Sequence, residues 1–327
     1  MTVQDGFGHL LDNLKLDPDE VKRARAVHNE LSDLLIAKGV AVRTRLQGSF
    51  ARKTMLRPLK DVDKIIELRT EHEGLLREPG GTEAAFAMIR DAVQSKFPMA
   101  WFEPKRHALC IHLPDCPFDF DAVPAFNTPA TDTGMIEIAN TDDDTWDESN
   151  TYILIAAVQK RNDDCSGAFI HQVRMAKQAF KTHGVKIPGL HIETFAYRAV
   201  TTKTDHPAAV LAILDKAVAM LAGDYMDLTD FDRISDKVDE SERITARATL
   251  TRVAADARRA VDLAAEGDEH GACTIWRNVF GDNFPMPGPA PAKQGISNLF
   301  KGGSVLGGVT TAVRPSNPAN PTRSWRP

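Results

Sequence analysis

Two pairs of aspartates, each separated by one residue, are the strongest chemical feature of this sequence. Asp61 and Asp63 lie in "KDVDKIIEL", and Asp119 and Asp121 lie in "FDFDAVPAF". Their apolar neighbours favour strands, and residues two apart in a strand project from the same face. Asp119 or Asp121 could therefore complete a group of three carboxylates with the first pair. Three such oxygen ligands suit Mg²⁺, which takes its other ligands from water and substrate phosphates.

A small-residue turn precedes the first pair at Gly48 and Ser49. Each feature alone is common, because most D-x-D pairs are exposed strand ends or turn caps, and Gly-Ser is an ordinary turn. The combination of this turn, a D-x-D strand and a later D-x-V-P strand indicates a metal platform. Two ions about 3.5 to 4 Å apart would activate an attacking hydroxyl and stabilise a departing pyrophosphate.

Composition limits the other classes of function. The chain has 327 residues, of which 43% are hydrophobic and 26% charged, so it is globular and long enough for two domains. Its net charge of −5 disfavours constitutive nucleic-acid binding. The four cysteines form no CxxC pair, and His270 with Cys273 lacks a second half for a zinc site, so free thiols are expected. No signal peptide or long apolar run is visible, which predicts a cytoplasmic protein without a membrane partner.

The patterns change from mixed α/β to helical along the chain. Asp17, Pro18 and Glu20 predict a capped helix start with a capping box, and Gly39 predicts its end. The acidic run at 141–149 is expected to be a solvated loop. The elements expected are a helix at 17–39, strands ending at Gly48 and spanning 61–68, a helix at 81–97, three strands between 100 and 126, and helices at 171–184, 205–221, 242–267 and 272–281.

These patterns predict three regions. They are a catalytic core with an N-terminal spine helix at 1–145, a helical lobe at 146–286 and a flexible Pro- and Gly-rich tail at 287–327. The tail has too few apolar residues to fold by itself.

Several motifs resemble those of a known family. "GSFARKTMLRPLKDVD" resembles the signature of polymerase-β-like nucleotidyltransferases, and "FDFDAVPAF" is similar to the third-carboxylate strand of their oligoadenylate-synthase and cGAS-like branch. Within that branch, "HQVRMAKQAFK" and "WRNVFGDNFP" resemble segments of the bacterial CD-NTases, the cyclic-oligonucleotide synthases of antiphage defence. The resemblance implies an α/β fold, with a polymerase-β-like core containing a mixed sheet and a helical second lobe.

The resemblance also implies roles for individual residues. Asp61, Asp63 and Asp121 would bind metal, with Asp119 as a flanking carboxylate. Gly48 and Ser49 would hold the triphosphate of a bound nucleotide. Lys177 would contact its β- and γ-phosphates, and Arg174 lies one turn earlier on the same helical face. Glu193 is interpreted as a capping or pairing residue. Lys64 departs from the family pattern, in which an aliphatic residue is usual, and is expected to pair with an acid or to reach solvent.

The implied reaction is nucleotidyl transfer with two Mg²⁺ or Mn²⁺ ions. Nucleoside triphosphates, ATP or GTP or both, would be condensed into a cyclic di- or trinucleotide, and regulatory proteins of a defence operon are possible partners. A linear 2′-5′ oligoadenylate synthase and an RNA or tRNA nucleotidyltransferase are alternatives from the same superfamily. A non-catalytic nucleotide-binding scaffold is an alternative of another class.

Overall fold

The computed structural model describes residues 1–127 and 134–288. The segment Met1–Gly288 is one compact unit. The tail predicted at 287–327 therefore lies, from residue 289 onward, outside the described residues. Among the helices described, none has the length and apolar character needed to cross a membrane.

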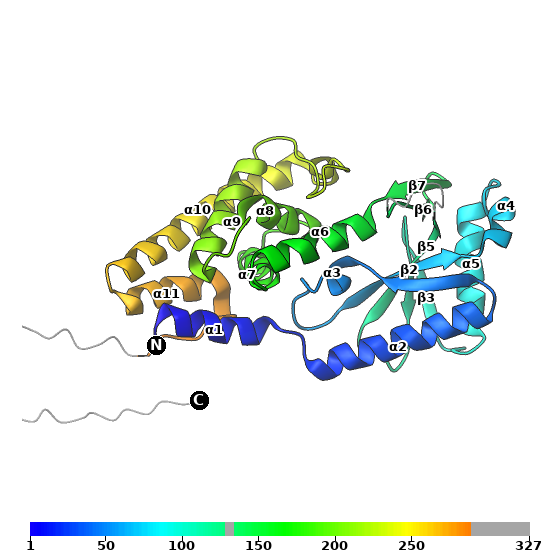
Figure 1. Cartoon of the computed structure of the whole chain (residues 1–327), viewed down its shortest axis with the longest axis horizontal. Coiled ribbons are helices and arrows are strands. Elements are labelled where there is room, and N and C mark those ends of the chain that lie inside the picture. The colour runs from blue at the N-terminus through cyan, green and yellow to red at the C-terminus, as the bar shows by residue number, and fades with distance from the viewer. Residues whose placement is uncertain (128–133, 289–327) are drawn as a thin grey trace, which may run out of the picture. The chain divides into compact units, whose positions relative to one another are not determined.

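A seven-stranded mixed sheet forms the centre of the first half (Figure 1). Five strands follow the order β1-β2-β5-β4-β3, and β6 pairs with both β5 and β7. The strands are β1 (Ala41–Leu46), β2 (Asp61–Leu68), β3 (Trp101–Pro104), β4 (Leu109–His112), β5 (Asp119–Asn127), β6 (Ile136–Asn140) and β7 (Thr145–Ser149).

The pairing of β2 with β5 brings the two D-x-D segments together. These strands run parallel, with Asp61 opposite Asp119 and Asp63 opposite Asp121. Because alternate residues share a face, all four carboxylates project from one side of the sheet. On the other side of β5, the antiparallel strand β4 places Cys110 opposite Asp121.

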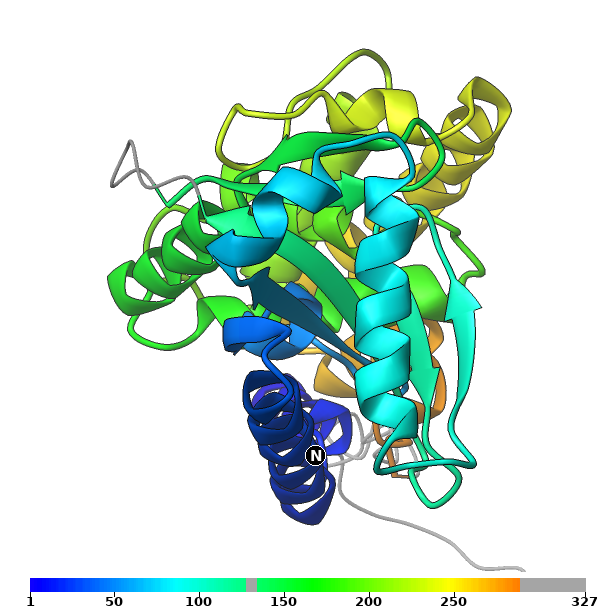
Figure 2. The same cartoon turned by 90° about the vertical axis from the view of Figure 1, so that its right-hand side faces the viewer.

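The two faces of the sheet have different environments. One face is covered by α2 (Pro18–Ala37) and by α5 (Gly81–Gln94), which lies across the sheet in Figure 2. Val62, Ile66 and Phe120 are buried in the core on this face. The opposite face carries the aspartates and a small apolar cluster around Ile65 and Val123.

The helical half has its own hydrophobic core. The first helix, α1 (Val3–Leu14), contributes Phe7 to that core, where its ring makes edge contacts with Trp276, Phe280 and Phe284. The domain division at 145 remains a prediction, although α1 packs here and not with the sheet. The other helices are α6 (Thr151–Asp164), α7 (Phe169–Thr182), α8 (Gly189–Ala199), α9 (His206–Met220), α10 (Glu240–Ala265) and α11 (Glu269–Phe280).

Two local predictions from the sequence are wrong. The capping box at the start of α2 does not form, because Asp17 accepts from the backbone N–H of Asp19 while a buried oxygen of Glu20 has no hydrogen-bond partner among the described residues. The acidic run at 141–149 is a turn followed by strand β7, and Asp144 accepts hydrogen bonds from Gly80 and Thr82. Pairing with β6 gives this polar segment a strand conformation that its composition does not indicate.

The environment of Lys64 also differs from the prediction. Its side chain does not reach solvent, since the residue is 1% exposed, and it forms no ion pair with an acid in the described part of the chain. The Nζ atom donates to the carbonyl oxygen of His28 and to the hydroxyl of Ser32, both at 2.8 Å, which fastens β2 to α2. Burial lowers the pKa of Lys64 to about 7, with a smaller opposing effect from Asp33.

We expect Lys64→Met to abolish a pH dependence of stability. A lysine in the unfolded chain has a pKa of about 10.4, so between that value and about 7 the folded protein binds fewer protons than the unfolded chain. Wild-type stability should therefore rise with pH in this window, by at most about 1.4 kcal/mol per unit. The methionine variant should gain most over wild type near pH 7, and the gain should shrink toward pH 10.

Denaturant titrations at several pH values measure this difference. Lys22→Met, at an exposed position of α2, the helix that Lys64 contacts, is the matched control and should follow wild type. An unchanged pH trend in Lys64→Met would show that Lys64 is not the residue responsible.

Candidate active site

Gly48 and Asp63 are in unusually close contact. Gly48 begins the short helix α3 (Gly48–Ala51) directly after β1, with φ of +65°. A Cβ atom at this position would lie 1.7 Å from Oδ2 of Asp63. The backbone N–H of Gln47 also donates to the Asp63 carbonyl oxygen at 2.9 Å. Only glycine meets both requirements, the positive φ and the space for the carboxylate.

The aspartates create a local excess of negative charge. Burial first, and then the charges of Asp61 and Asp121, raise the pKa of Asp63 to about 6. Burial and the charge of Asp121 also raise the pKa of Asp61. These carboxylates would ionise more readily with a cation between them. The strand register places the three aspartates predicted from the sequence beside one another, and their role as metal ligands remains a prediction.

Lys105 supplies a positive charge that sequence reasoning did not identify. It precedes β4, and its Nζ atom lies 2.8 Å from both carboxylate oxygens of Asp121. Partial burial opposes its charge, but the contact with Asp121 raises the pKa of Lys105 overall. The sequence gives only a basic residue just after a strand end, and the pairing of β4 with β5 is what brings it to the aspartates.

A buried ionic network joins this region to the helical half. Glu193, in α8, is fully buried; its Oε2 lies 2.5 Å from Nε of Arg52, and its Oε1 lies 2.7 Å from Nζ of Lys177. Thr54 donates to the same carboxylate at 2.6 Å. Burial alone would raise the pKa of Glu193, but Arg52 and Lys177 lower it to about 2. The interpretation of Glu193 as a pairing residue is confirmed.

A cavity of about 250 Å³ lies beside the aspartates. Its lining brings together Ser49, Asp61 and Lys177, all singled out from the sequence. Its other lining residues include three more cations, Arg57, Lys60 and Lys181, which sequence reasoning missed because each occurs in an ordinary basic context. Positive side chains beside the aspartates suit a triphosphate, because they would neutralise the negative charge of its terminal phosphates.

Arg174 lies apart from this cavity. It lines a separate one of about 390 Å³, together with Phe50, Lys53 and residues of the α1–α2 connection. Its Nε atom is buried with no hydrogen-bond partner among the described residues, and burial lowers its pKa. The structure therefore does not bring Arg174 to Ser49, and its assignment to a phosphate remains a prediction.

The donor set fits a hard divalent cation. Asp61, Asp63 and Asp121 offer oxygen ligands only, and the pKa values of Asp61 and Asp63 are raised because these carboxylates lie near one another in a partly buried place. Oxygen-only ligation of this kind is what Mg²⁺ and Mn²⁺ prefer.

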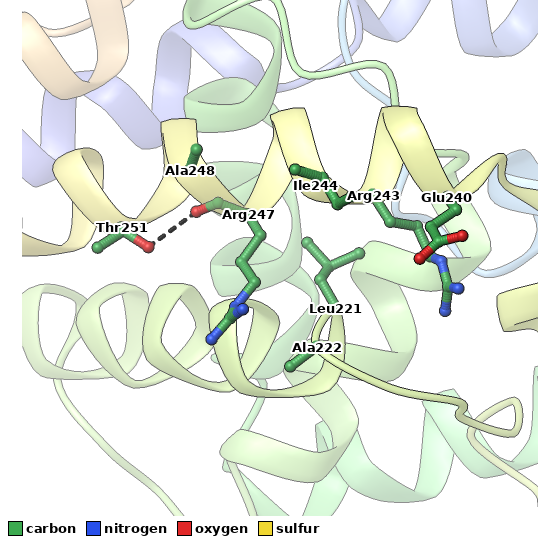
Figure 3. A pocket seen from close by; sticks show the side chains of 8 residues that line it. All are labelled: Leu221, Ala222, Glu240, Arg243, Ile244, Arg247, Ala248 and Thr251. Atoms are coloured by element: carbon green, nitrogen blue, oxygen red, sulfur yellow. Dashed lines mark hydrogen bonds between the residues drawn. The ribbon is translucent and has the colours of Figure 1, made fainter.

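Another hollow lies along α10, where Figure 3 shows Leu221, Ile244 and two arginines around it. Among the described residues that line it, Glu240 is the only one with a carboxylate. Without a group of converging carboxylates, this hollow does not match the chemistry of the aspartate site.

Comparisons with known proteins agree with this geometry. Residues 1–162 match the model of the Second Messenger Oligonucleotide or Dinucleotide Synthetase domain. The chain is 22% identical to the cyclic AMP-AMP-GMP synthase of Enterobacter hormaechei subsp. hoffmannii, in an alignment that covers 100% of both proteins.

Solved structures share the fold. The chain is similar to CdnC of E. coli MS115-1, solved with ATP, at 18% identity and a TM-score of 0.67, over 87% of this chain and 99% of CdnC. It is similar to the Vibrio cholerae cyclic AMP-GMP synthase DncV, solved with a linear intermediate, at 14% identity and a TM-score of 0.65, over 84% and 94%. The nucleotidyltransferase fold follows from these likenesses.

We expect Gly48→Ala to reduce product formation at least about 100-fold, because the new methyl group must displace the Asp63 carboxylate, and an error of about 1 Å in a catalytic group costs about that much. Gly39→Ala is the matched control, since Gly39 also has positive φ but no atom within 4 Å of the added Cβ. Backbone strain of about 1 to 2 kcal/mol is common to both variants. Equal activities of the two purified variants would contradict this reading.

We expect Asp63→Asn to raise the melting temperature of the metal-free protein near pH 8. The folded-state pKa of about 6 lies above the unfolded value of about 3.9, so wild-type stability falls as pH rises through that window. The advantage of the variant should vanish near pH 4. Added Mg²⁺ should raise the melting temperature of wild type and of the exposed control Asp91→Asn, but not that of Asp63→Asn. A variant less stable than wild type at pH 8 would contradict the prediction.

Proposed function

We propose that the chain is a member of the CD-NTase family and that it condenses nucleoside triphosphates into a cyclic di- or trinucleotide messenger for antiphage signalling. The observation that carries the proposal is the β2–β5 register, which sets Asp61 and Asp63 beside Asp121 next to Ser49. A non-catalytic scaffold would not need carboxylates that repel one another at this position.

Different side chains of the site would bind and orient the triphosphate. Gly48 leaves room for the Asp63 carboxylate, and Ser49 presents a hydroxyl to the cavity that would hold the triphosphate. Lys177 lies in the same lining, held by Glu193 and Thr54. These contacts fix the ammonium group before substrate binds, which reduces the entropy lost on ordering the complex.

Asp61, Asp63 and Asp121 would hold Mg²⁺ or Mn²⁺. When bound, the divalent cations neutralise phosphate charge and lower the pKa of the attacking 2′- or 3′-hydroxyl. Lys105 now compensates the charge of Asp121, and it would have to share or release that carboxylate when a cation is present.

We propose ATP and GTP as substrates. The Enterobacter relative is named as a cyclic AMP-AMP-GMP synthase, and a second relative, from Salmonella paratyphi B, as a probable cyclic AMP-AMP-GMP nucleotide synthase. CdnC was solved with ATP and the Bradyrhizobium diazoefficiens enzyme CdnG with GTP. A regulatory protein partner is also proposed, since a structure of CdnC is a complex with HORMA-deltaN.

Product analysis tests the proposed reaction. The purified protein is incubated with the four labelled triphosphates and Mg²⁺ or Mn²⁺, and the mixture is then treated with phosphatase. A phosphatase-resistant product containing adenine and guanine is expected, because a closed ring has no terminal phosphate. A phosphatase-sensitive oligonucleotide would instead identify a linear synthase, and transfer only to added RNA would identify an RNA nucleotidyltransferase.

We expect the two acids of β5 to differ in importance. Asp121→Asn should be inactive, because Asp121 lies opposite Asp63 and completes the proposed metal site. Asp119→Asn should retain measurable turnover, because Asp119 lies at the outer end of the strand and is held by His112. Initial rates of pyrophosphate release measure both variants, and the reverse order would move the third ligand to Asp119.

A further inference from the structure

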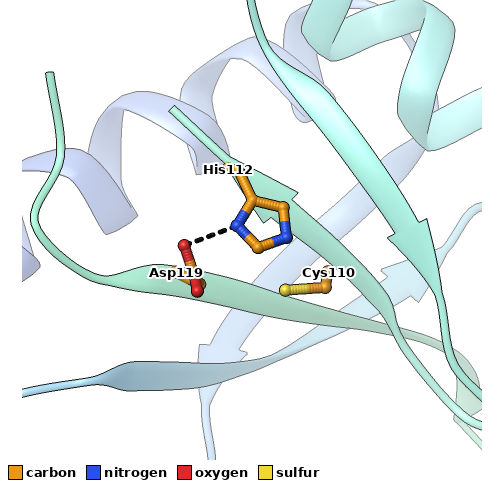
Figure 4. A group of neighbouring side chains, drawn as sticks. All are labelled: Cys110, His112 and Asp119. Atoms are coloured by element: carbon orange, nitrogen blue, oxygen red, sulfur yellow. Dashed lines mark hydrogen bonds and ion pairs between the residues drawn. The ribbon is translucent and has the colours of Figure 1, made fainter. Parts of the chain in front are cut away.

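A second group of potential ligands lies on the same face of the sheet as the aspartates. Cys110 and His112 come from β4 and Asp119 comes from β5, and one ligand atom from each lies within 4.8 Å of the others (Figure 4). The antiparallel register that sets Cys110 opposite Asp121 brings His112 beside Asp119. The cluster therefore follows from the same strand pairing that assembles the candidate active site.

The chemistry of this cluster differs from that of the three aspartates. A thiol and an imidazole are poor ligands for Mg²⁺, but together with one carboxylate they suit a borderline ion such as Zn²⁺. We propose that Cys110, His112 and Asp119 form a binding site for a divalent transition-metal ion of this kind, next to the three aspartates but with different ligands. The cysteine spacing in the sequence gives no sign of it, because the third ligand comes from a neighbouring strand.

The imidazole is already oriented for this role. Its Nδ1 lies 2.7 Å from the Asp119 carboxylate, and its ring stacks on Trp101 with centroids 3.3 Å apart and planes 6° from parallel. Its Nε2 is buried and has no hydrogen-bond partner among the described residues. The nearest acid to Nε2 is Glu103, whose Oε2 lies 3.9 Å away. Stacking on Trp101 and the contact with Asp119 fix the orientation of the ring, which reduces the reorganisation that metal binding at Nδ1 requires.

Binding would redistribute two protons. The ion would take the place between His112 Nδ1 and Asp119, and the imidazole proton would move to Nε2, facing Glu103. The thiol proton of Cys110 would be released to solvent, leaving a thiolate as the third ligand. Water would complete a tetrahedral site. The ion can enter from the Asp119 side, where the carboxylate side chain is 42% exposed.

Cobalt spectroscopy tests the proposal on the full chain. Metal-free protein in saturating Mg²⁺ is titrated with Co²⁺, which reports thiolate ligation by a charge-transfer absorption. One ion per chain with this absorption is expected, and Zn²⁺ should displace it. Cys110→Ser should lose the absorption, and the matched control Cys116→Ser should keep it. His112→Ala should weaken cobalt binding at least about tenfold.

Two outcomes would contradict the proposed metal site. They are the absence of thiolate absorption in wild type, and its persistence in Cys110→Ser. X-ray absorption of the zinc-loaded wild type gives the same answer without a variant, because one sulfur ligand at about 2.3 Å is expected. Neither measurement depends on catalysis, so failure of this proposal and failure of the proposed nucleotidyl transfer are distinguishable.

Discussion

The parallel register of β2 and β5 is the constraint on which the rest of the candidate site depends. It sets Asp61 against Asp119 and Asp63 against Asp121, so four carboxylates share one end of the sheet. Such a concentration of like charge destabilises the folded state unless cations compensate it. Lys105 does so at Asp121, and the charge of Arg52 favours the ionised form of Asp63. The sheet thus holds these carboxylates near one another, and this arrangement favours the binding of a cation.

Glu193 extends this compensation into the helical half. Arg52, which acts on Asp63, is held by a carboxylate from α8, and the same carboxylate holds Lys177 of α7. Removing one partner of a buried ion pair leaves an uncompensated charge, which typically costs about 3 to 5 kcal/mol. The arrangement of α7 and α8 and the electrostatics of the aspartates are therefore coupled through one buried acid, which also holds Lys177 in the lining of the cavity at Ser49.

The sequence predicts the features that depend on local pattern. The period of two in "DVD" and "DFD" correctly places each pair on one face, and the helix from Pro18 is recognisable from its first residues and from Gly39. The features it misses depend on pairing between distant segments. Strand β7 is polar and forms only because β6 pairs with it, and Lys105 reaches Asp121 only through the β4–β5 pairing. Short-range periodicity carries no information on such contacts.

Lys177 and Arg174 show the same limit within one helix. They lie three residues apart, close enough to share a face, yet they line different cavities. The two residues differ in the side chains that they contact. Glu193 and Thr54 accept two of the three donor hydrogens of the Lys177 ammonium group, and Lys177 lines the Ser49 cavity. Arg174 meets no such acid among the described residues and lies beside Phe50 and Lys53 instead. Helical spacing alone therefore does not show which of the two cations lines the Ser49 cavity, because the position of Lys177 depends on an acid on another helix.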